Sequence, residues 1–436
     1  MLKKKLRIAI NAQLTPESGT GGIVSVLRAL ARVTELDGPE EYVFVGPYDD
    51  PEWLRPLLSG QQSIVRGPNP RPAEKQDTQD DAARGRLFAR RLGRMFGIRS
   101  ESESERPGLS GSKFFESLNC DVVHFPFQTF EKCSVPTIFN PHDLQHVHFR
   151  EFFSPADIVR REQLYPMACR AAHTVVVASN FVKDDVVEHF SLDPRKVQVI
   201  PWAPPPLVQS SHQAEGKTDL EVARKYGLVN GPFALYPAMT WEHKNHIRLL
   251  EAVAQLRDHD GLALQVVCTG FKTDFWPQIE KRLHEMKLQE LVKFPGLIPV
   301  EDLNALYRSA QFVIVPTLYE AASAPVFEAW QHGVAVACSR VNGLPEQAGV
   351  GALLFDPMSV SEIKSALRRL GDDRFCEDLR LRGSRRLSEF SWERTAKSYR
   401  AVYRRAAGQK LNDEDRWLLA SDVQSKSETE IEALQA

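Results

Sequence analysis

The chain has 436 residues, of which 42% are apolar and 26% are charged. This composition supplies a sizeable core, and the length is typical of two domains. Lys and Arg number 55 against 57 Asp and Glu, a net charge of −2, so no basic excess is available to hold a nucleic-acid backbone and a dedicated DNA or RNA binder is excluded.

Short β-branched runs alternate with helical patterns from the start of the chain. Residues 6–12 follow a basic stretch, but Asn11 interrupts the apolar run early, so we expect a first strand and not a signal peptide. Residues 22–36 carry apolar side chains at helical spacing. Further strands are expected at 42–46, 121–125, 137–140, 174–178 and 197–201.

The alternation pauses at 201–216, where four prolines fall between Pro201 and Pro206. It then resumes. Strands are expected at 233–237, 264–269, 292–296, 312–316, 334–339 and 353–356, and helices at 246–258, 276–286, 300–310, 324–333 and 360–370. This order predicts an α/β protein with two Rossmann-like parallel-sheet domains facing across a cleft, where the carboxyl ends of the strands bind the ligand.

Two segments do not fit this alternation. Residues 68–112 are rich in Pro, Gly, Ser and charge, and we interpret them as a flexible insertion. Residues 411–436 carry seven acidic and two basic residues and are expected to form a solvated acidic tail. The proposed division is therefore a first domain at 1–205, with the insertion near 68–112, and a second domain at 206–387.

The six cysteines form no CxxC pair, so neither a zinc knuckle nor a redox motif is indicated. No apolar run approaches the roughly 20 residues of a membrane-spanning helix. We therefore expect a cytoplasmic protein, with contact to the inner face of the cell membrane as an alternative.

The most distinctive motif lies after the predicted strand 312–316. Glu320 and Glu328 are eight positions apart, separated by Ala-Ala-Ser-Ala-Pro-Val-Phe. Residues 321–324, which include Ser323 and Ala324, would present backbone N–H groups at a helix N-terminus, where an anion or a hydroxyl-rich ligand binds. A Glu at position 328 can accept hydrogen bonds from the vicinal hydroxyls of a ribose. The alternative is a surface loop with two solvated glutamates.

A cation stands at the corresponding place after the first strand of the second domain. Lys244 precedes the predicted helix 246–258, and both a Lys and a helix N-terminus favour phosphate. An ordinary surface Lys is the alternative, but the two glutamates in the same domain favour the phosphate role. Gly21 and Gly22 close the first strand. They do not complete a dinucleotide fingerprint, because its last Gly is replaced by Val24.

Together these motifs resemble the family 4 glycosyltransferases, which are retaining, nucleotide-sugar-dependent enzymes of the GT-B fold. The E-x7-E block matches their donor-site signature. Further similar segments occur in the family's order: Tyr236 to His246, Phe139 to Leu144, Val175 to Phe181, and Phe390 to Glu393. The resemblance covers roughly residues 5–55 and 118–408. It implies an acceptor-side first domain, a donor-binding second domain and a C-terminal helix at 388–410 that crosses back to the first domain.

The resemblance also implies roles for individual residues. Lys244 would neutralise the donor diphosphate, Glu328 would hold the ribose, and Glu320 would orient the sugar together with the amides that follow it. His142 would contact the donor sugar from the first domain, with Asp143 orienting or capping. The loop at Gly21 and Gly22 would have a secondary role near the acceptor and the donor phosphates. The catalytic residues expected are therefore His142, Glu320 and Lys244.

The sequence departs from the family pattern in two places. Where Gly-Phe-Gly-Leu is common after the first Glu, this chain has Ala-Ala-Ser-Ala, so the sugar preference of the family does not transfer. Met239 stands where many members have an Arg, which removes one cation from the diphosphate clamp. We expect His243 to compensate for part of that charge.

These observations predict a hexosyltransferase of polysaccharide biosynthesis. It would move a hexose from a nucleotide diphosphate sugar to a hydroxyl of a glycan or lipid-linked glycan, and the His-Lys-Asn loop leans toward mannose. No metal or other cofactor is expected, because neither Asp-x-Asp segment, at 258–260 or at 413–415, follows a strand. Two alternatives remain: a GT-B sugar-nucleotide epimerase, and a catalytically silent binding subunit, which the Met239 departure favours.

The insertion adds a separate hypothesis. Residues 84–99 contain six arginines interleaved with apolar side chains, as in basic helices that lie in a membrane interface. Gly85, Gly93 and Gly97 weaken such a helix. Peripheral membrane contact and a solvated loop are both open interpretations.

Overall fold

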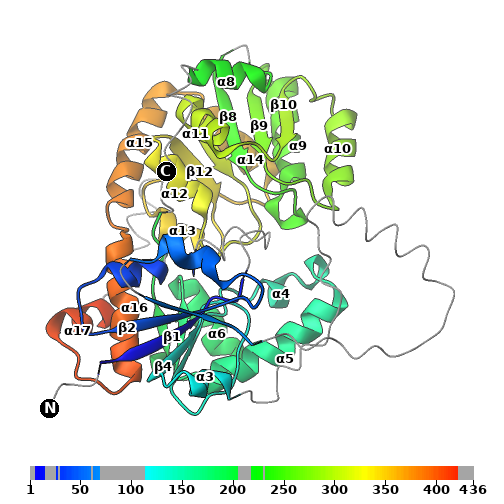
Figure 1. Cartoon of the computed structure of the whole chain (residues 1–436). Helices are drawn as coiled ribbons and strands as arrows, with labels where there is room; N and C mark the ends of the chain where they lie inside the picture. Colours follow the sequence, from blue (N-terminus) through cyan, green and yellow to red (C-terminus); the bar gives the residue numbers. More distant parts are fainter. Residues whose placement is uncertain are drawn as a thin grey trace.

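The computed structural model describes residues 5–14, 26–27, 30–59, 62–68, 113–204, 218–228 and 231–420. They form two α/β domains stacked one on the other, with the second domain above the first in Figure 1. The predicted residues Gly21 and Gly22 and the stretch 84–99 lie outside the described residues.

The first domain is built on a seven-stranded sheet in the order β3-β2-β1-β4-β5-β6-β7, and every described pair is parallel. Its strands are β1 Arg7–Asn11, β2 Glu41–Gly46, β3 Ser63–Arg66, β4 Val122–Phe125, β5 Thr137–Phe139, β6 Thr174–Val177 and β7 Val197–Val199. The strands are Val- and Ile-rich, and those inside the sheet are buried on both faces, as a parallel sheet between helices requires.

Helices and short turns connect these strands. They are η1 Arg32–Glu35, η2 Pro51–Leu57, α3 Phe114–Ser117, α4 Gln145–His148, η3 Arg150–Phe152, α5 Pro155–Ala171, α6 Asn180–Phe190 and η4 Pro194–Lys196. Ser179 begins α6 as its N-cap, because its hydroxyl accepts the N–H of Val182. Strand β3 was not predicted: its four residues are only partly buried and carry no clear alternation.

The second domain has a six-stranded parallel sheet in the order β10-β9-β8-β11-β12-β13. Its strands are β8 Phe233–Pro237, β9 Gln265–Thr269, β10 Val292–Gly296, β11 Phe312–Val315, β12 Ala335–Ser339 and β13 Leu353–Phe355. Each agrees within a residue or two with its predicted range.

Helices pack against the faces of this sheet. They are α8 Asp219–Lys225, η5 Glu242–Lys244, α9 His246–Asp260, α10 Trp276–Glu285, α11 Val300–Ser309, α12 Ala324–Gln331, α13 Leu344–Ala348, α14 Val360–Arg369 and α15 Asp373–Leu387. Five were predicted from apolar spacing. Helix α15 was not, because part of its buried face consists of Gly383 and Arg386. The missing Cβ of Gly383 leaves room for the ring of Trp330.

Helix α16, Trp392–Ala406, leaves the second domain and packs into the first, as the resemblance implied (Figure 1). Its Tyr399, Val402 and Tyr403 share one core with Ile8 and Phe44 of the first sheet. Ser391 starts the helix by accepting the N–H of Arg394.

The predicted solvated tail is wrong for its first residues. Asp413–Ala420 form helix α17 against α16. Asp415 is buried there and pairs with Arg404 at 3.1 Å, and Leu418 is buried beside it. Glu414 also pairs with Lys397 of α16, at 3.0 Å, so two acidic residues of this segment pair with basic residues of α16. Among the described helices, none is long and apolar enough to cross a bilayer.

Candidate active site

The loop after β8 brings Lys244 to the carboxyl edge of the second sheet. It ends at Asn245, whose φ of 62° is a left-handed conformation that Asn tolerates better than most residues. The Asn245 side chain donates to the carbonyls of Pro316 and Pro357, both at 2.9 Å. The hydroxyl of Tyr236 donates to the Lys244 carbonyl at 2.7 Å. The loop is thus anchored to the ends of several strands.

Lys244 and Glu320, predicted from separate motifs, are direct partners. Strands β8 and β11 are neighbours in the sheet, so the loops that follow them meet at one edge. The Lys244 Nζ lies 2.6 Å from Glu320 Oε2, and the two side chains are 19% and 20% exposed. A bound diphosphate would therefore have to compete with Glu320 for this ammonium group.

His243 is the residue expected to compensate for the cation absent at Met239. Burial, together with the nearby Lys244 and His246, lowers the pKa of His243 well below its ordinary value. The ring is therefore neutral near pH 7, and it lies 6.0 Å from the ring of Phe152 in the first domain. His243 can therefore offer a hydrogen bond to a ligand, and its compensation for the charge lost at Met239 stays a prediction.

The loop between the two glutamates offers fewer free amides than predicted. The Ser323 N–H donates to Gln347 Oε1 at 2.7 Å, and Gln347 Nε2 donates back to the Ser323 carbonyl at 2.8 Å. Ser323 is the N-cap residue of α12, and its buried hydroxyl has no partner among the described residues. Ala324 opens the helix, so the N–H groups of 321, 322 and 324 remain the candidates for a ligand.

Glu328 lies on α12 and is held by a tyrosine of the preceding helix. The hydroxyl of Tyr307, on α11, donates to Glu328 Oε2 at 2.6 Å. Burial raises the pKa of Glu328, and the Tyr307 hydrogen bond opposes that rise. Glu328 is therefore a partly buried, oriented carboxylate, and the alternative of two solvated surface glutamates does not describe this loop.

His142 lies in the first domain, after β5, with a φ of 68°. Its Nε2 lies 2.8 Å from the Pro126 carbonyl. A carbonyl only accepts, so Nε2 carries the proton and Nδ1 is left as an acceptor. Burial lowers the pKa of His142, with Asp143 opposing, so the ring is neutral. Asp143 accepts the N–H of Gln145, the first residue of α4, at 3.0 Å.

The two domains meet through the residue that precedes Glu320. The hydroxyl of Tyr319 accepts the N–H of Leu144 at 3.3 Å. Its ring stacks on His148, with centroids 5.7 Å apart, and meets the edge of Phe149 at 6.0 Å. No sequence pattern singles out Tyr319, Tyr307 or Gln347, because each acts through a partner at least 21 positions away in the chain.

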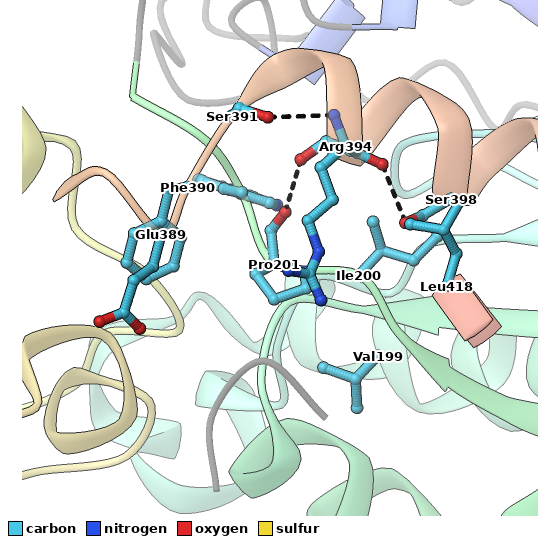
Figure 2. Close-up of a pocket in the computed structure, with 11 residues that line it drawn as sticks. Val199, Ile200, Pro201, Glu389, Phe390, Ser391, Arg394, Ser398 and Leu418 are labelled. Atoms are coloured by element: carbon cyan, nitrogen blue, oxygen red, sulfur yellow. Dashed lines mark hydrogen bonds between the residues drawn. The ribbon is translucent and has the colours of Figure 1, made fainter. Parts of the chain in front are cut away.

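A pocket lies between the end of the first sheet and the start of α16 (Figure 2), and its lining residue Trp202 meets the ring of His142 edge to face, with centroids 6.1 Å apart. It is lined by the end of β7 and the linker, by the start of α16 and by Leu418. Arg394 points into the pocket, and its guanidinium carbon lies 4.7 Å from the centroid of the Trp417 ring. None of the predicted site residues lines this pocket. In the described part of the chain, no three His, Cys, Asp or Glu side chains are grouped as a metal centre requires.

This architecture defines the class of protein. Two parallel-sheet α/β domains are linked by a returning C-terminal helix, and a charged constellation lies at the carboxyl edge of the second sheet, which is the GT-B arrangement of glycosyltransferases. Two family models match the chain: Glycosyltransferase Family 4 over residues 20–203 and Glycosyl transferases group 1 over residues 232–373. The chain belongs to the family 4-like glycosyltransferases.

Curated relatives agree with that membership, and a solved structure agrees with the fold. O-antigen chain mannosyltransferase B of Escherichia coli is 28% identical over 59% of this chain and 70% of its own length. MMP alpha-(1->4)-mannosyltransferase of Mycolicibacterium hassiacum is 29% identical over 56% of this chain and 57% of its own length. The fold is similar to that of Anabaena HepE in complex with UDP and glucose, with a TM-score of 0.61, 14% identity and coverage of 91% and 99% of the two chains.

Proposed function

We propose that this protein is a retaining hexosyltransferase that moves mannose from a nucleotide diphosphate sugar to a hydroxyl of a glycan or lipid-linked glycan. The observation that carries the proposal is the Lys244–Glu320 pair at the mouth of the Glu320–Glu328 loop. It places an ammonium group, a helix N-terminus and two carboxylates at one sheet edge, a combination suited to a diphosphate and a polyhydroxylated ligand. The relatives named as mannosyltransferases support the choice of sugar.

In this scheme the second domain binds the donor. Lys244 leaves Glu320 to neutralise the diphosphate, and Glu320 turns to the sugar hydroxyls. Glu328, oriented by Tyr307, accepts from the ribose hydroxyls. Neutral His142 meets the sugar from the first domain with its unprotonated Nδ1. The transition state would be stabilised by charges around the departing diphosphate, in a cleft from which domain contact excludes water.

The test is a donor panel on the purified protein. A bound nucleotide raises the melting temperature, because a ligand at 100 times its Kd adds roughly 2.7 kcal/mol to the free energy of unfolding. If the donor is GDP-mannose, GDP should raise the melting temperature more than UDP, dTDP or ADP. GDP-mannose with a mannosylated acceptor should then yield an α-linked product by NMR. Consumption of the donor without any acceptor would favour the epimerase, and tight nucleotide binding without turnover would favour a silent subunit.

The charge scheme uses no metal, so we expect transfer to continue in excess EDTA. Complete loss of transfer that Mg²⁺ restores would contradict it. For the acceptor, co-sedimentation of the active protein with anionic vesicles at low salt would favour a lipid-linked glycan met at the cytoplasmic membrane face. Absence of binding would favour a soluble glycan.

A further inference from the structure

Helix α13 lies between the donor loop and helix α6 of the first domain. The carboxylate of Glu346 accepts the N–H of Asn180 at 2.8 Å and the N–H of Phe181 at 2.6 Å. These are amides of the first turn of α6, which find no acceptor inside their own helix. A carboxylate at this end of an eleven-residue helix is also favoured by the helix dipole. The contact joins the two domains directly.

The same short segment holds the donor loop at both of its ends. Asn342 Oδ1 accepts the N–H of Glu320, and the N–H of Gly343 donates to the Glu320 carbonyl, both at 3.3 Å. At the other end Gln347 pairs with the N–H and carbonyl of Ser323. Glu346 and Gln347 are consecutive, so the residue that grips the first domain adjoins the residue that grips the loop.

The packing at Gly343 allows little movement between these parts. A Cβ added there would lie 2.2 Å from the Ala321 carbonyl oxygen and 3.0 Å from the Ser179 hydroxyl. The segment thus passes between the donor loop and the N-cap of α6 at a separation that only glycine permits. Arg386 fixes α13 from behind by donating to the carbonyls of Glu346 and Gln347, at 2.6 Å and 3.0 Å.

We propose that Glu346 and Gln347 are positioning residues that couple the docking of helix α6 to the geometry of the donor loop. The loop from Glu320 to Ser323 would reach its working position when Glu346 holds the first turn of α6. The inference rests on the proposed function, because it assigns that loop to the donor sugar. Removing Glu346 should therefore impair turnover while the nucleotide still binds to the second domain.

The experiment compares Glu346→Gln and Glu346→Ala with wild type. The amide of Glu346→Gln keeps one acceptor oxygen, so we expect an intermediate effect. For Glu346→Ala we expect kcat to fall about tenfold or more, the scale on which misplacement of reacting groups acts. The Kd for GDP should stay within about twofold of wild type. Hydrogen exchange of the first-turn amides of α6 should accelerate in both variants, because their acceptor is weakened or lost.

A second variant removes the same contact from the other side. Asn180 is the first residue of α6, where proline is well tolerated and its missing N–H is harmless to the helix. Ser179 before it is extended, with φ −148° and ψ 162°, as a residue preceding proline should be. Asn180→Pro should therefore lower kcat several-fold relative to Asn180→Ala, which loses the side chain but keeps the N–H.

The matched control is Glu362→Gln, since Glu362 also accepts a backbone N–H, that of Asp356, but within the second domain. It should leave kcat and GDP binding unchanged. Normal turnover by Glu346→Ala, or loss of GDP affinity in proportion to kcat, would overturn the coupling. If wild type transfers no sugar at all, the proposed function fails, whereas the exchange of the α6 amides still tests the contact itself.

Discussion

Lys244 and Glu320 come from the ends of neighbouring strands and share a hydrogen-bonded ion pair at 2.6 Å. Both side chains are about four-fifths buried, so their attraction is screened less than that of a surface pair. The pair has two consequences. It holds the Lys244 side chain in the site before any ligand binds. It also opposes diphosphate binding, because the contact with Glu320 has to be broken before the ammonium group can pair with phosphate.

Glu320→Gln should therefore bind nucleoside diphosphate more tightly while it turns over more slowly. The amide no longer neutralises Lys244, and a gain of about 1 kcal/mol, roughly fivefold in Kd, is expected from the freed ammonium group. Titration calorimetry with GDP measures the affinity, and the transfer assay measures the rate.

Glu242→Gln is the matched control for charge, because Glu242 is an exposed carboxylate on the same loop. It changes the net charge equally without touching the pair. An equal gain in affinity from both variants, or none from Glu320→Gln, would show that the internal contact does not limit diphosphate binding.

At the scale of elements, helix α16 is fastened to the first sheet by a chain of buried hydrogen bonds. Asn140 donates to the Tyr399 hydroxyl at 2.9 Å, so its Oδ1 faces His124 and accepts from Nε2 at 2.9 Å. That leaves Nδ1 of His124 to accept from the Tyr403 hydroxyl at 2.8 Å. Burial lowers the pKa of His124 to about 4, consistent with this neutral ring. The helix is thereby anchored by polar contacts as well as by its apolar face.

Tyr403→Phe should lower the free energy of unfolding by about 1–3 kcal/mol, because Nδ1 of His124 would stay buried without a donor. Urea denaturation measures this. Tyr42→Phe is the control: Tyr42 packs edge-on against Tyr403, but its buried hydroxyl has no partner among the described residues. Removing that hydroxyl should be neutral or stabilising. Equal losses in the two variants would mean that the hydrogen bond between Tyr403 and His124 does not account for the loss of stability.

At the scale of the whole molecule, buried neutral histidines make stability depend on pH. Burial lowers the pKa of His124 and of His146 to about 4 and that of His246 to about 3, from an ordinary value of 6.5. Between pH 6.5 and pH 4 these histidines are protonated in the unfolded chain and remain neutral in the folded chain. Stability therefore falls as the pH is lowered through this window, by on the order of 3 kcal/mol for His124 alone.

His246→Leu should flatten that dependence. His246 is buried against Tyr236 and Phe294, and neither ring nitrogen has a partner among the described residues. An apolar side chain of similar size costs little there and does not titrate. Thermal unfolding from pH 7 to pH 4.5 gives the slope. His259→Gln, on the exposed end of the same helix, should keep the wild-type slope, and an unchanged slope in His246→Leu would refute the argument.

Much of the fold follows from local pattern. Strand β8 was predicted at its observed bounds, because a parallel strand buried on both faces is a short apolar run that stands out from its surroundings. Elements without a clear apolar pattern of their own were not predicted from the sequence. The buried face of helix α15 relies on the fit of Gly383 to Trp330, and the short edge strand β3 has little apolar character of its own.

For the candidate site, the sequence by itself determined which chemical groups are available and after which strands they lie: Lys244, Glu320, Glu328 and His142. It did so because loops after parallel strands converge on one edge of the sheet. Only the tertiary structure decided which groups pair and what charge they carry. Lys244 meets Glu320, Tyr307 orients Glu328, and burial keeps His243 neutral. Pairing and desolvation depend on groups that are distant in sequence, such as Glu346 and the first turn of α6. A local sequence pattern does not show which distant groups will lie in contact.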